Sequence, residues 1–432
     1  MNKKQAEDFV YKFYLRAQKY QKYEDKDSEK RRNDLTYDLL HEVSKTPCCV
    51  ITGSKGKGSV ANMISQILQT KYTVGLMTSP HIVDFCERFR VNGGKISDNE
   101  FIKYIEEMQE EIDAIDQNLP PNVCISPMGI QAYLALNYFK EQKTDFNVFE
   151  CGKGAKYDDV NNIRHDYAII NSIFLEHTRE LGETLEEIAE DKSHVITGEQ
   201  KCIYVAEQNP EVLEVIKKRA NQYQVPVKIY GKDFLAKNIQ YTKEGMLFDV
   251  VIEEKTYGNI LLPLLGEHQA KNCALAMALC MDVVQTPASS DFLAIKKNLQ
   301  KIHWPGRMEV INTQPFTLLD ACINKASCEN VIKVLNHLQI DGATVIIGIP
   351  DDKDYLGVAK AMGEKAGNII LTKSGNPHYI FTKNQQDRLL EEGIHTQWTE
   401  SVKEALEVAG AYKNPVVILG TTSVIAEVKS IV

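Results

Sequence analysis

Residues 48–59 read Cys48-Cys49-Val50-Ile51-Thr52-Gly53-Ser54-Lys55-Gly56-Lys57-Gly58-Ser59. The first five form a short apolar run, which predicts a buried strand. After the glycines, apolar residues recur on one face of a predicted helix: Val60, Met63, Ile64, Ile67 and Leu68. A second β-branched run follows at residues 73–78. The sequence therefore predicts a strand, a glycine-rich loop, a helix and a second strand.

The glycine-rich loop has the composition of a phosphate-binding loop. Gly53, Gly56 and Gly58 let the backbone turn sharply and bring its N–H groups close to an anion. The start of the following helix adds partial positive charge. Lys57 can reach a terminal phosphate, and the hydroxyl of Ser59 can hold Mg²⁺. The spacing G-x-x-G-K-G-S departs from the common G-x-x-x-x-G-K-[ST], so a tight turn with a solvated lysine is the alternative. We favour phosphate binding because βα units bind phosphate at this position.

Composition excludes several classes of protein. The 432 residues carry a net charge of −9, which disfavours a broad nucleic-acid interface, and 43% of them are hydrophobic, enough for a sizeable core. No run approaches the length of a membrane span, and the first residues do not resemble a signal peptide. The ten cysteines include no C-x-x-C pair, which fits reduced thiols. We expect a cytoplasmic monomer that binds small molecules, without nucleic-acid or membrane partners.

Polar residues follow the predicted strands at the edge where parallel sheets bind ligands. Ser79, Glu150 and His177 all hold such positions. His177 alone could be a base, a zinc ligand or a histidine satisfied by the backbone. Residues 79–93 are too polar and broken for a helix or a buried strand, so we predict a long loop. That loop is either a lid over the site or a surface connection.

The pattern changes in the second half of the chain. Residues 239–265 alternate and predict a small antiparallel patch, and residues 268–284 predict a largely buried helix. Strands and helices alternate again from residue 302 onward. The predicted fold is α/β. Residues 1–301 form an ATPase-type domain with a phosphate loop, a mostly parallel sheet, the antiparallel patch and an N-terminal helical segment. Residues 302–432 form a smaller Rossmann-like domain.

Five separated motifs resemble those of the Mur ligase superfamily, most closely of folylpolyglutamate synthase and the bifunctional dihydrofolate synthase. They run in the family's order over nearly the whole chain. The motifs are Thr52-Gly53-Ser54-Lys55-Gly56-Lys57-Gly58-Ser59, Ser79-Pro80-His81 through Arg88, Leu175-Glu176-His177 through Ala189 with Lys192, Leu264-Leu265-Gly266-Glu267-His268-Gln269 with Asn272, and Trp304-Pro305-Gly306-Arg307.

The resemblance implies ATP-dependent amide formation. A carboxylate takes the γ-phosphoryl group of ATP, and the amino group of an amino acid, usually glutamate, attacks the acyl phosphate. Cations must screen the approach of the two anions. The resemblance implies that Ser79 and Glu150 bind Mg²⁺ and that His177 holds a second Mg²⁺. It also implies carbamylation of Lys192, which needs a neutral amine and hence a lowered pKa. From the residues alone, Lys192 reads as an exposed helix lysine.

The remaining roles also follow from the resemblance. Arg307 contacts phosphate or ribose, Asp320 the ribose hydroxyls and Asn272 the adenine. Arg88 belongs to the predicted substrate site.

The chain also departs from the family pattern. Ile323 replaces the histidine of D-x-A-H-N, and Lys55 stands where asparagine is usual. Lys156 replaces an arginine, which changes a bidentate site. Asp158 holds the place of an aspartate that contacts the pterin. These departures concern the acceptor more than the ATP and metal groups.

The sequence thus predicts an ADP-forming amide ligase that adds glutamate to a folate-like carboxylate. One alternative is a ligase of the same chemistry with a non-folate acceptor, which the changed residues 153–158 motivate. Another is a non-catalytic protein that binds ATP or folate, which Ile323 motivates.

Overall fold

The computed structural model describes residues 1–21, 31–41, 43, 45–285, 289–376 and 379–432. Its largest sheet has eight strands in the order β4-β3-β2-β5-β1-β6-β7-β8, and neighbouring strands pair in parallel except in the pairs β4–β3 and β3–β2. The strands are β1 Cys48–Thr52, β2 Val74–Met77, β3 Phe89–Val91, β4 Gly94–Lys95, β5 Phe146–Glu150, β6 Tyr167–Ile170, β7 Cys202–Val205 and β8 Val227–Ile229.

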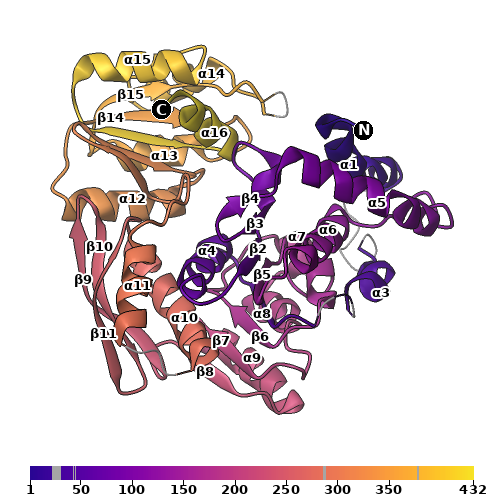
Figure 1. Ribbon diagram of the computed structural model, residues 1–432. Coiled ribbons are helices and arrows are strands. Elements are labelled where there is room, and N and C mark those ends of the chain that lie inside the picture. Colours follow the sequence, from indigo (N-terminus) through magenta and orange to yellow (C-terminus); the bar gives the residue numbers. More distant parts are fainter. Residues whose placement is uncertain (22–30, 42, 44, 286–288, 377–378) are drawn as a thin grey trace.

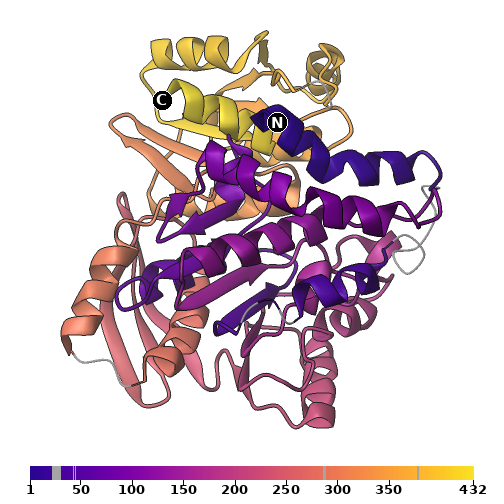
Figure 2. The ribbon, with the colours of Figure 1, turned by 45° about the vertical axis from the view of Figure 1, so that its right-hand side comes forward.

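Helices cover both faces of this sheet (Figure 1). Those of the first part of the chain are α1 Lys3–Gln18, α3 Tyr37–Leu40, α4 Lys57–Leu68, α5 Asp98–Asp116, α6 Pro127–Glu141, α7 Thr178–Leu181, α8 Leu185–Ser193, α9 Pro210–Tyr223, α10 Glu267–Val284 and α11 Ser289–Leu299. Short 3-10 helices are η1 Asn33–Thr36, η2 Phe85–Arg88 and η3 Asp159–Asn162. The N-terminal helix α1 lies along α5 (Figure 2).

The central strand β1 is buried on both faces, as its apolar sequence predicts. Cys49 and Ile51 belong to the core that includes α4 and α10, whereas Cys48 and Val50 belong to the core that includes α1, α5 and α6. Successive side chains of a strand point to opposite faces, so each helix layer receives alternate residues. The sheet edge at the end of β1 is thereby held rigidly between two packed layers.

Two further sheets complete the fold. The predicted antiparallel patch is confirmed and consists of β9 Phe234–Thr242, β10 Gly245–Ile252 and β11 Lys255–Leu262. The C-terminal sheet has the order β12-β13-β17-β14-β15-β16 and is parallel except for β12. Its strands are β12 Glu309–Thr313, β13 Phe316–Asp320, β14 Ala343–Gly348, β15 Ala366–Leu371, β16 Gln397–Trp398 and β17 Val416–Gly420. Its helices are α12 Lys325–His337, α13 Tyr355–Met362, α14 Asn384–Glu391, α15 Val402–Tyr412 and α16 Thr422–Ile431.

The predicted α/β class, with its large mostly parallel sheet and second α/β part, is therefore confirmed. The predicted boundary after residue 301 falls in the connection between α11 and β12. Tyr241 of β9 stacks on His337 of α12 with ring centroids 4.1 Å apart, so the antiparallel sheet supports the C-terminal part. No helix among the described residues is both long enough and apolar enough to cross a membrane.

The prediction of a loop throughout residues 79–93 is wrong in its second half. That half forms η2 and β3, and β3 pairs with β2. Asp84 caps η2 by accepting the backbone N–H of Cys86 at 3.0 Å. Phe85 and Phe89 are buried in the core beside α5. Polar residues alternate with these buried aromatic residues. The polar composition of the whole segment therefore gave no indication of η2 and β3.

Candidate active site

The phosphate loop, residues 53–59, joins β1 to α4 in the middle of the large sheet. β1 lies between β5 and β6, so the loop is at a topological switch point of the sheet, where parallel α/β folds bind ligands. Gly56 has a φ of 78°. A Cβ atom there would lie 2.6 Å from Asn171 Nδ2, so both backbone conformation and space require glycine. No described side chain caps the start of α4, whose first N–H groups can therefore bind an anion.

Two lysine side chains meet at the carbonyl oxygen of Gly53. Lys57 Nζ donates to this oxygen at 3.1 Å and Lys192 Nζ donates to it at 3.0 Å. Lys192 is 1% exposed and forms an ion pair with Glu176 at 3.1 Å. Burial lowers the pKa of Lys192 and the charge of Lys57 lowers it further, whereas Glu176 raises it. The interpretation of Lys192 as an exposed helix lysine is wrong.

Glu150 supplies a buried carboxylate next to the loop. Its Oε2 accepts the backbone N–H of Ser79 at 2.9 Å, and a Cβ atom at Gly58 would lie 3.2 Å from the same oxygen. Burial raises the pKa of Glu150, an effect that the charge of Lys57 opposes. In the described part of the chain, no lysine or arginine forms an ion pair with this carboxylate. A buried, unpaired carboxylate near the buried Ser59 fits a hard cation such as Mg²⁺.

His177 begins the short helix α7 with a φ of 47°. Its side chain is exposed and forms no hydrogen bond within the described residues, so the interpretation of a histidine satisfied by the backbone is wrong. The preceding residue, Glu176, carries the carboxylate that pairs with Lys192. The imidazole therefore neighbours, along the chain, the carboxylate that pairs with the buried lysine.

Asn272 lies on the other side of the phosphate loop, in the first half of α10. Its Oδ1 accepts from Asn171 Nδ2 at 3.2 Å, and its Nδ2 donates to Gln269 Oε1 at 3.2 Å. Both asparagines would lie within 3.1 Å of a Cβ atom at Gly56. The side-chain amides of Asn171 and Asn272 therefore line one side of the phosphate loop, and Asn272 links that side to α10.

The C-terminal part contributes charged groups to the same region. The Arg307 charge lowers the pKa of Glu150 as well as that of Asp320, so its guanidinium lies within electrostatic reach of both carboxyl groups. Asp320 accepts the backbone N–H of Met308 at 2.8 Å. Burial raises the pKa of Asp320 to about 6 against the opposing charge of Arg307. A Cβ atom at Gly58 would lie 3.0 Å from the indole of Trp304, so the W-P-G-R motif contacts the loop directly.

The predicted acceptor residues have three different environments. Arg88 is buried and donates from Nε to His81 Nδ1 at 2.9 Å and from an η nitrogen to Gln131 Oε1 at 2.7 Å. Asp158 is 0% exposed, and its two oxygens accept three backbone N–H groups of its own loop. Lys156 is exposed, with its Nζ 5.3 Å from the ring centroid of Tyr157. The structure therefore uses Asp158 to shape the loop, and its contact with a substrate stays a prediction.

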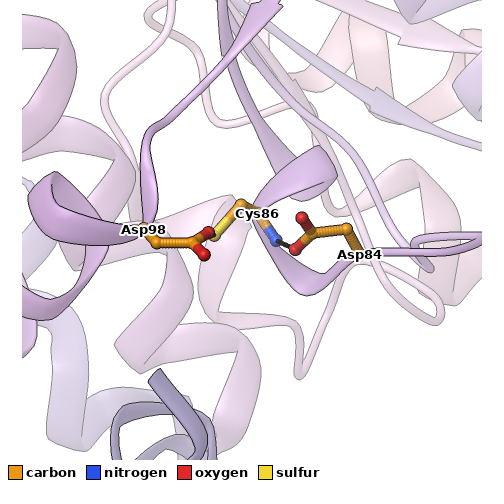
Figure 3. A group of neighbouring side chains, drawn as sticks. All are labelled: Asp84, Cys86 and Asp98. Atoms are coloured by element: carbon orange, nitrogen blue, oxygen red, sulfur yellow. Dashed lines mark hydrogen bonds between the residues drawn. The ribbon is translucent and has the colours of Figure 1, made fainter. Parts of the chain in front are cut away.

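Asp84, Cys86 and Asp98 form a second group of potential metal ligands, away from the phosphate loop (Figure 3). Lys3 donates to Asp84 at 2.8 Å and to Asp98 at 2.7 Å, and Lys95 also pairs with Asp84. Burial alone would raise the pKa of Asp84, but hydrogen bonds from the two lysines hold it well below its usual range. The two aspartates are therefore neutralised by two lysines, and these ion pairs attach α1 to the segment that follows β2.

Sequence reasoning did not single out three residues that hold the site together: Glu176, Asn171 and Gln131. Asn171 directly follows β6, so the strand-end rule that selected Glu150 could have found it. Glu176 precedes the selected histidine within one motif. Gln131 lies inside α6 and meets Arg88 only through the tertiary fold, so no local pattern indicated it.

Comparisons with known proteins find one family and several relatives. The Mur ligase middle domain family matches residues 51–280. The dihydrofolate synthase/folylpolyglutamate synthase of Bacillus subtilis is 30% identical over 407 residues, which cover 92% of this chain and 93% of that protein.

Solved structures share the fold. The folylpolyglutamate synthase of Mycobacterium tuberculosis, complexed with ADP and AMPPCP, superposes with a TM-score of 0.83 at 24% identity, covering 92% of this chain and 94% of that chain. The apo form of the L. casei enzyme gives a TM-score of 0.84 at 22% identity, covering 100% of this chain and 99% of that chain. Because the family model covers more than half of the chain and the Bacillus relative nearly all of it, this chain belongs to the Mur ligases, in the branch of the folylpolyglutamate and dihydrofolate synthases.

Proposed function

We propose that this chain is an ADP-forming ligase that adds L-glutamate to a folate-like carboxylate through an acyl phosphate. The observation that carries the proposal is the meeting of Lys57, Lys192 and the buried Glu150 around the phosphate loop. The named relatives are folylpolyglutamate and dihydrofolate synthases, one of them with ADP and AMPPCP bound. ATP is therefore the proposed phosphoryl donor.

The phosphate loop would bind the triphosphate through its backbone. Gly53, Gly56 and Gly58 allow the close approach of the chain, and the uncapped start of α4 attracts the anion. Lys57 now donates to a carbonyl oxygen and can exchange this neutral partner for a phosphate oxygen. Its charge then offsets the repulsion between the γ-phosphoryl group and the attacking carboxylate.

The rest of the nucleotide would lie between the two parts of the chain. In this proposal Arg307 would bind a phosphate or ribose oxygen, and Asp320 would bind the ribose hydroxyls. The amide of Asn272 would bind the adenine. Closure of the C-terminal part would exclude water, which otherwise hydrolyses the acyl phosphate.

Ser59, Ser79, Glu150 and His177 are the residues that would hold Mg²⁺. A bound Mg²⁺ neutralises phosphate charge and orients the transferred group. The carboxylate and hydroxyl oxygens suit this ion, whereas imidazole is a less usual ligand for it. Glu150 already meets one requirement, since it is buried without a cationic partner among the described residues.

Carbamylation of Lys192 is a finer proposal. Its lowered pKa favours the neutral amine that carbamylation needs, but the ion pair with Glu176 favours the ammonium form. A ¹³C NMR spectrum of protein equilibrated with labelled bicarbonate separates the two states. A carbamate resonance that disappears in Lys192→Ala supports carbamylation, and its absence from the wild-type spectrum contradicts it.

The alternative acceptor is favoured by the environment of Asp158. The resemblance implies that this position contacts a pterin, but here the carboxylate is fully buried and accepts hydrogen bonds from its own loop. Arg88 and the exposed Lys156 still offer positive charge to an anionic acceptor. A carboxylate acceptor without a pterin ring is therefore the second candidate. The monomeric state and the cytoplasmic location of the protein stay predictions.

Purified protein incubated with ATP, Mg²⁺, glutamate and tetrahydrofolate tests the function. Phosphate release together with a mass gain of one or more glutamate residues supports the folate reading. Turnover with another carboxylate alone supports the alternative acceptor. Binding of a non-hydrolysable ATP analogue without turnover of any acceptor would show a non-catalytic protein.

A further inference from the structure

Lys55 occupies the tip of the phosphate loop and has no role in the chemistry proposed above. The loop is fixed on both sides of it. Ser54 donates its N–H to Ser172 O at 2.9 Å, and its hydroxyl accepts the N–H of Phe174 at 3.2 Å. On the other side, Gly56 O accepts the first backbone hydrogen bond of α4 at 2.9 Å. The long side chain of Lys55 therefore extends from a rigid base.

The ammonium group of Lys55 reaches across to the C-terminal part of the chain. Its Nζ donates to Ser327 Oγ at 2.7 Å and lies 5.5 Å from the ring centroid of Phe174. Ser327 is in the first turn of α12, where its own N–H is held by Asn324 Oδ1 at 2.9 Å. Both ends of the Lys55–Ser327 contact are thus attached to ordered backbone, one in each part of the chain.

No carboxylate neutralises Lys55 within the described residues. Its charge instead acts on groups that surround the proposed nucleotide site. It lowers the pKa of His268 at the start of α10 and also that of Asp320 at the end of β13. The ammonium group therefore lies within electrostatic reach of three elements, the phosphate loop, α10 and β13.

We infer that Lys55 is a positioning residue, whose hydrogen bond to Ser327 holds the C-terminal part against the phosphate loop so that Arg307 and Asp320 meet the nucleotide. The inference rests on the proposed function for its activity measurements.

A double-mutant cycle tests the contact. Lys55→Met and Ser327→Ala should each raise KM for ATP about threefold, because the hydrogen bond is solvent-exposed and water replaces part of it. The double variant should be no worse than either single variant, because both remove one interaction. KM for the acceptor should stay unchanged, and Lys55→Arg should restore most of the ATP affinity. Lys232→Met, at an exposed turn after β8, is the matched control.

The alternatives give different results. If Lys55→Met raises KM while Ser327→Ala has no effect, Lys55 acts on the nucleotide directly and the inference is overturned. If neither variant changes KM, the contact is a surface hydrogen bond without function and the inference is also overturned. Additive effects on KM in the double variant would mean that the two residues act separately, and this result would also overturn the inference.

Small-angle scattering makes the test independent of turnover. With a non-hydrolysable ATP analogue, both single variants should show a larger radius of gyration than the wild type and Lys232→Met. Equal radii would contradict the inference. If the wild type turns over no acceptor at all, the proposed function fails, but calorimetric affinity for the analogue and the scattering profiles still decide whether Lys55 positions the C-terminal part.

Discussion

Lys57 and Lys192 donate to one and the same oxygen, the carbonyl of Gly53, at 3.1 and 3.0 Å. Two ammonium groups at one acceptor repel each other, and Glu176 compensates only the buried one. A triphosphate bound to the loop would relieve this repulsion by adding negative charge beside Lys57. The arrangement thus favours an anionic ligand before any ligand is present, which is electrostatic preorganisation.

Replacement of Lys57 by methionine should abolish most of the activity. Methionine keeps the length and apolar stem but not the charge that screens the two reacting anions. We expect kcat to fall about 100-fold or more, as for the loss of a single transition-state donor. Steady-state phosphate release measures this, with Lys232→Met as the control. Unchanged turnover of every acceptor would contradict the proposed role of the loop.

Glu176→Gln should destabilise the fold and not only the site. The variant leaves the Lys192 ammonium buried without its counter-ion, and breaking a buried pair from one side is costly. Because Glu176 is itself 19% exposed, water can compensate in part, and we expect a loss of about 1–3 kcal/mol. Urea unfolding measures the change. A double variant with Lys192→Met should recover part of the loss, and a failure to recover it would mean that the pair is not coupled.

Gly56→Ala should lower both stability and nucleotide affinity. The φ of 78° costs a side chain about 1–2 kcal/mol, and the new Cβ would collide with Asn171 Nδ2 at 2.6 Å. Gly231→Ala is a matched control, since Gly231 has a φ of 84° and open space around its Cβ position. Both variants should lose similar stability from the backbone, measured by thermal unfolding. Only Gly56→Ala should weaken ATP-analogue binding in calorimetry, and equal affinities would show that the Asn171 contact is irrelevant to the loop.

Most of the fold around the site could be predicted because its signals are local. The strand of residues 48–52, the glycines and the helical stripe after them lie within one continuous segment, and each follows a rule of periodicity or backbone conformation. The rule for strand ends selected Ser79 and Glu150, which the structure joins by a hydrogen bond of 2.9 Å. Local patterning was sufficient wherever neighbouring residues determine the conformation.

The contacts that complete the site could not be predicted in this way. Lys192 is on α8, far along the chain from the Gly53 carbonyl that it reaches. Its position in a charged helix indicated exposure, and only the packing of α8 against the sheet buries it. The prediction for η2 was wrong for a similar reason. Phe85 is buried by α1 and α5, which are distant in the sequence, so the local pattern could not show its burial. Tertiary burial overrides local polarity at these positions.

The pH dependence of ATP binding should depend on Asp320. Burial raises the pKa of this carboxyl to about 6, so it loses its charge as the pH falls through 6. If the carboxylate binds the ribose hydroxyls, KM for ATP should rise about fivefold between pH 6 and pH 5, since the ionised fraction falls from about one half to about one tenth. Asp320→Asn should show a higher but pH-independent KM over this range.

The same measurement separates binding from unfolding. The pKa of Asp320 is higher in the folded chain than the ordinary value, so its protonation between pH 6 and pH 4 favours the folded state. A loss of ATP affinity in that window therefore does not come from unfolding driven by this group, and circular dichroism at each pH checks that no other group unfolds the chain. Arg307 lowers the pKa, so Arg307→Met should move the midpoint of the KM profile above pH 6. A midpoint that stays in place in this variant would show that a group other than Asp320 controls the profile.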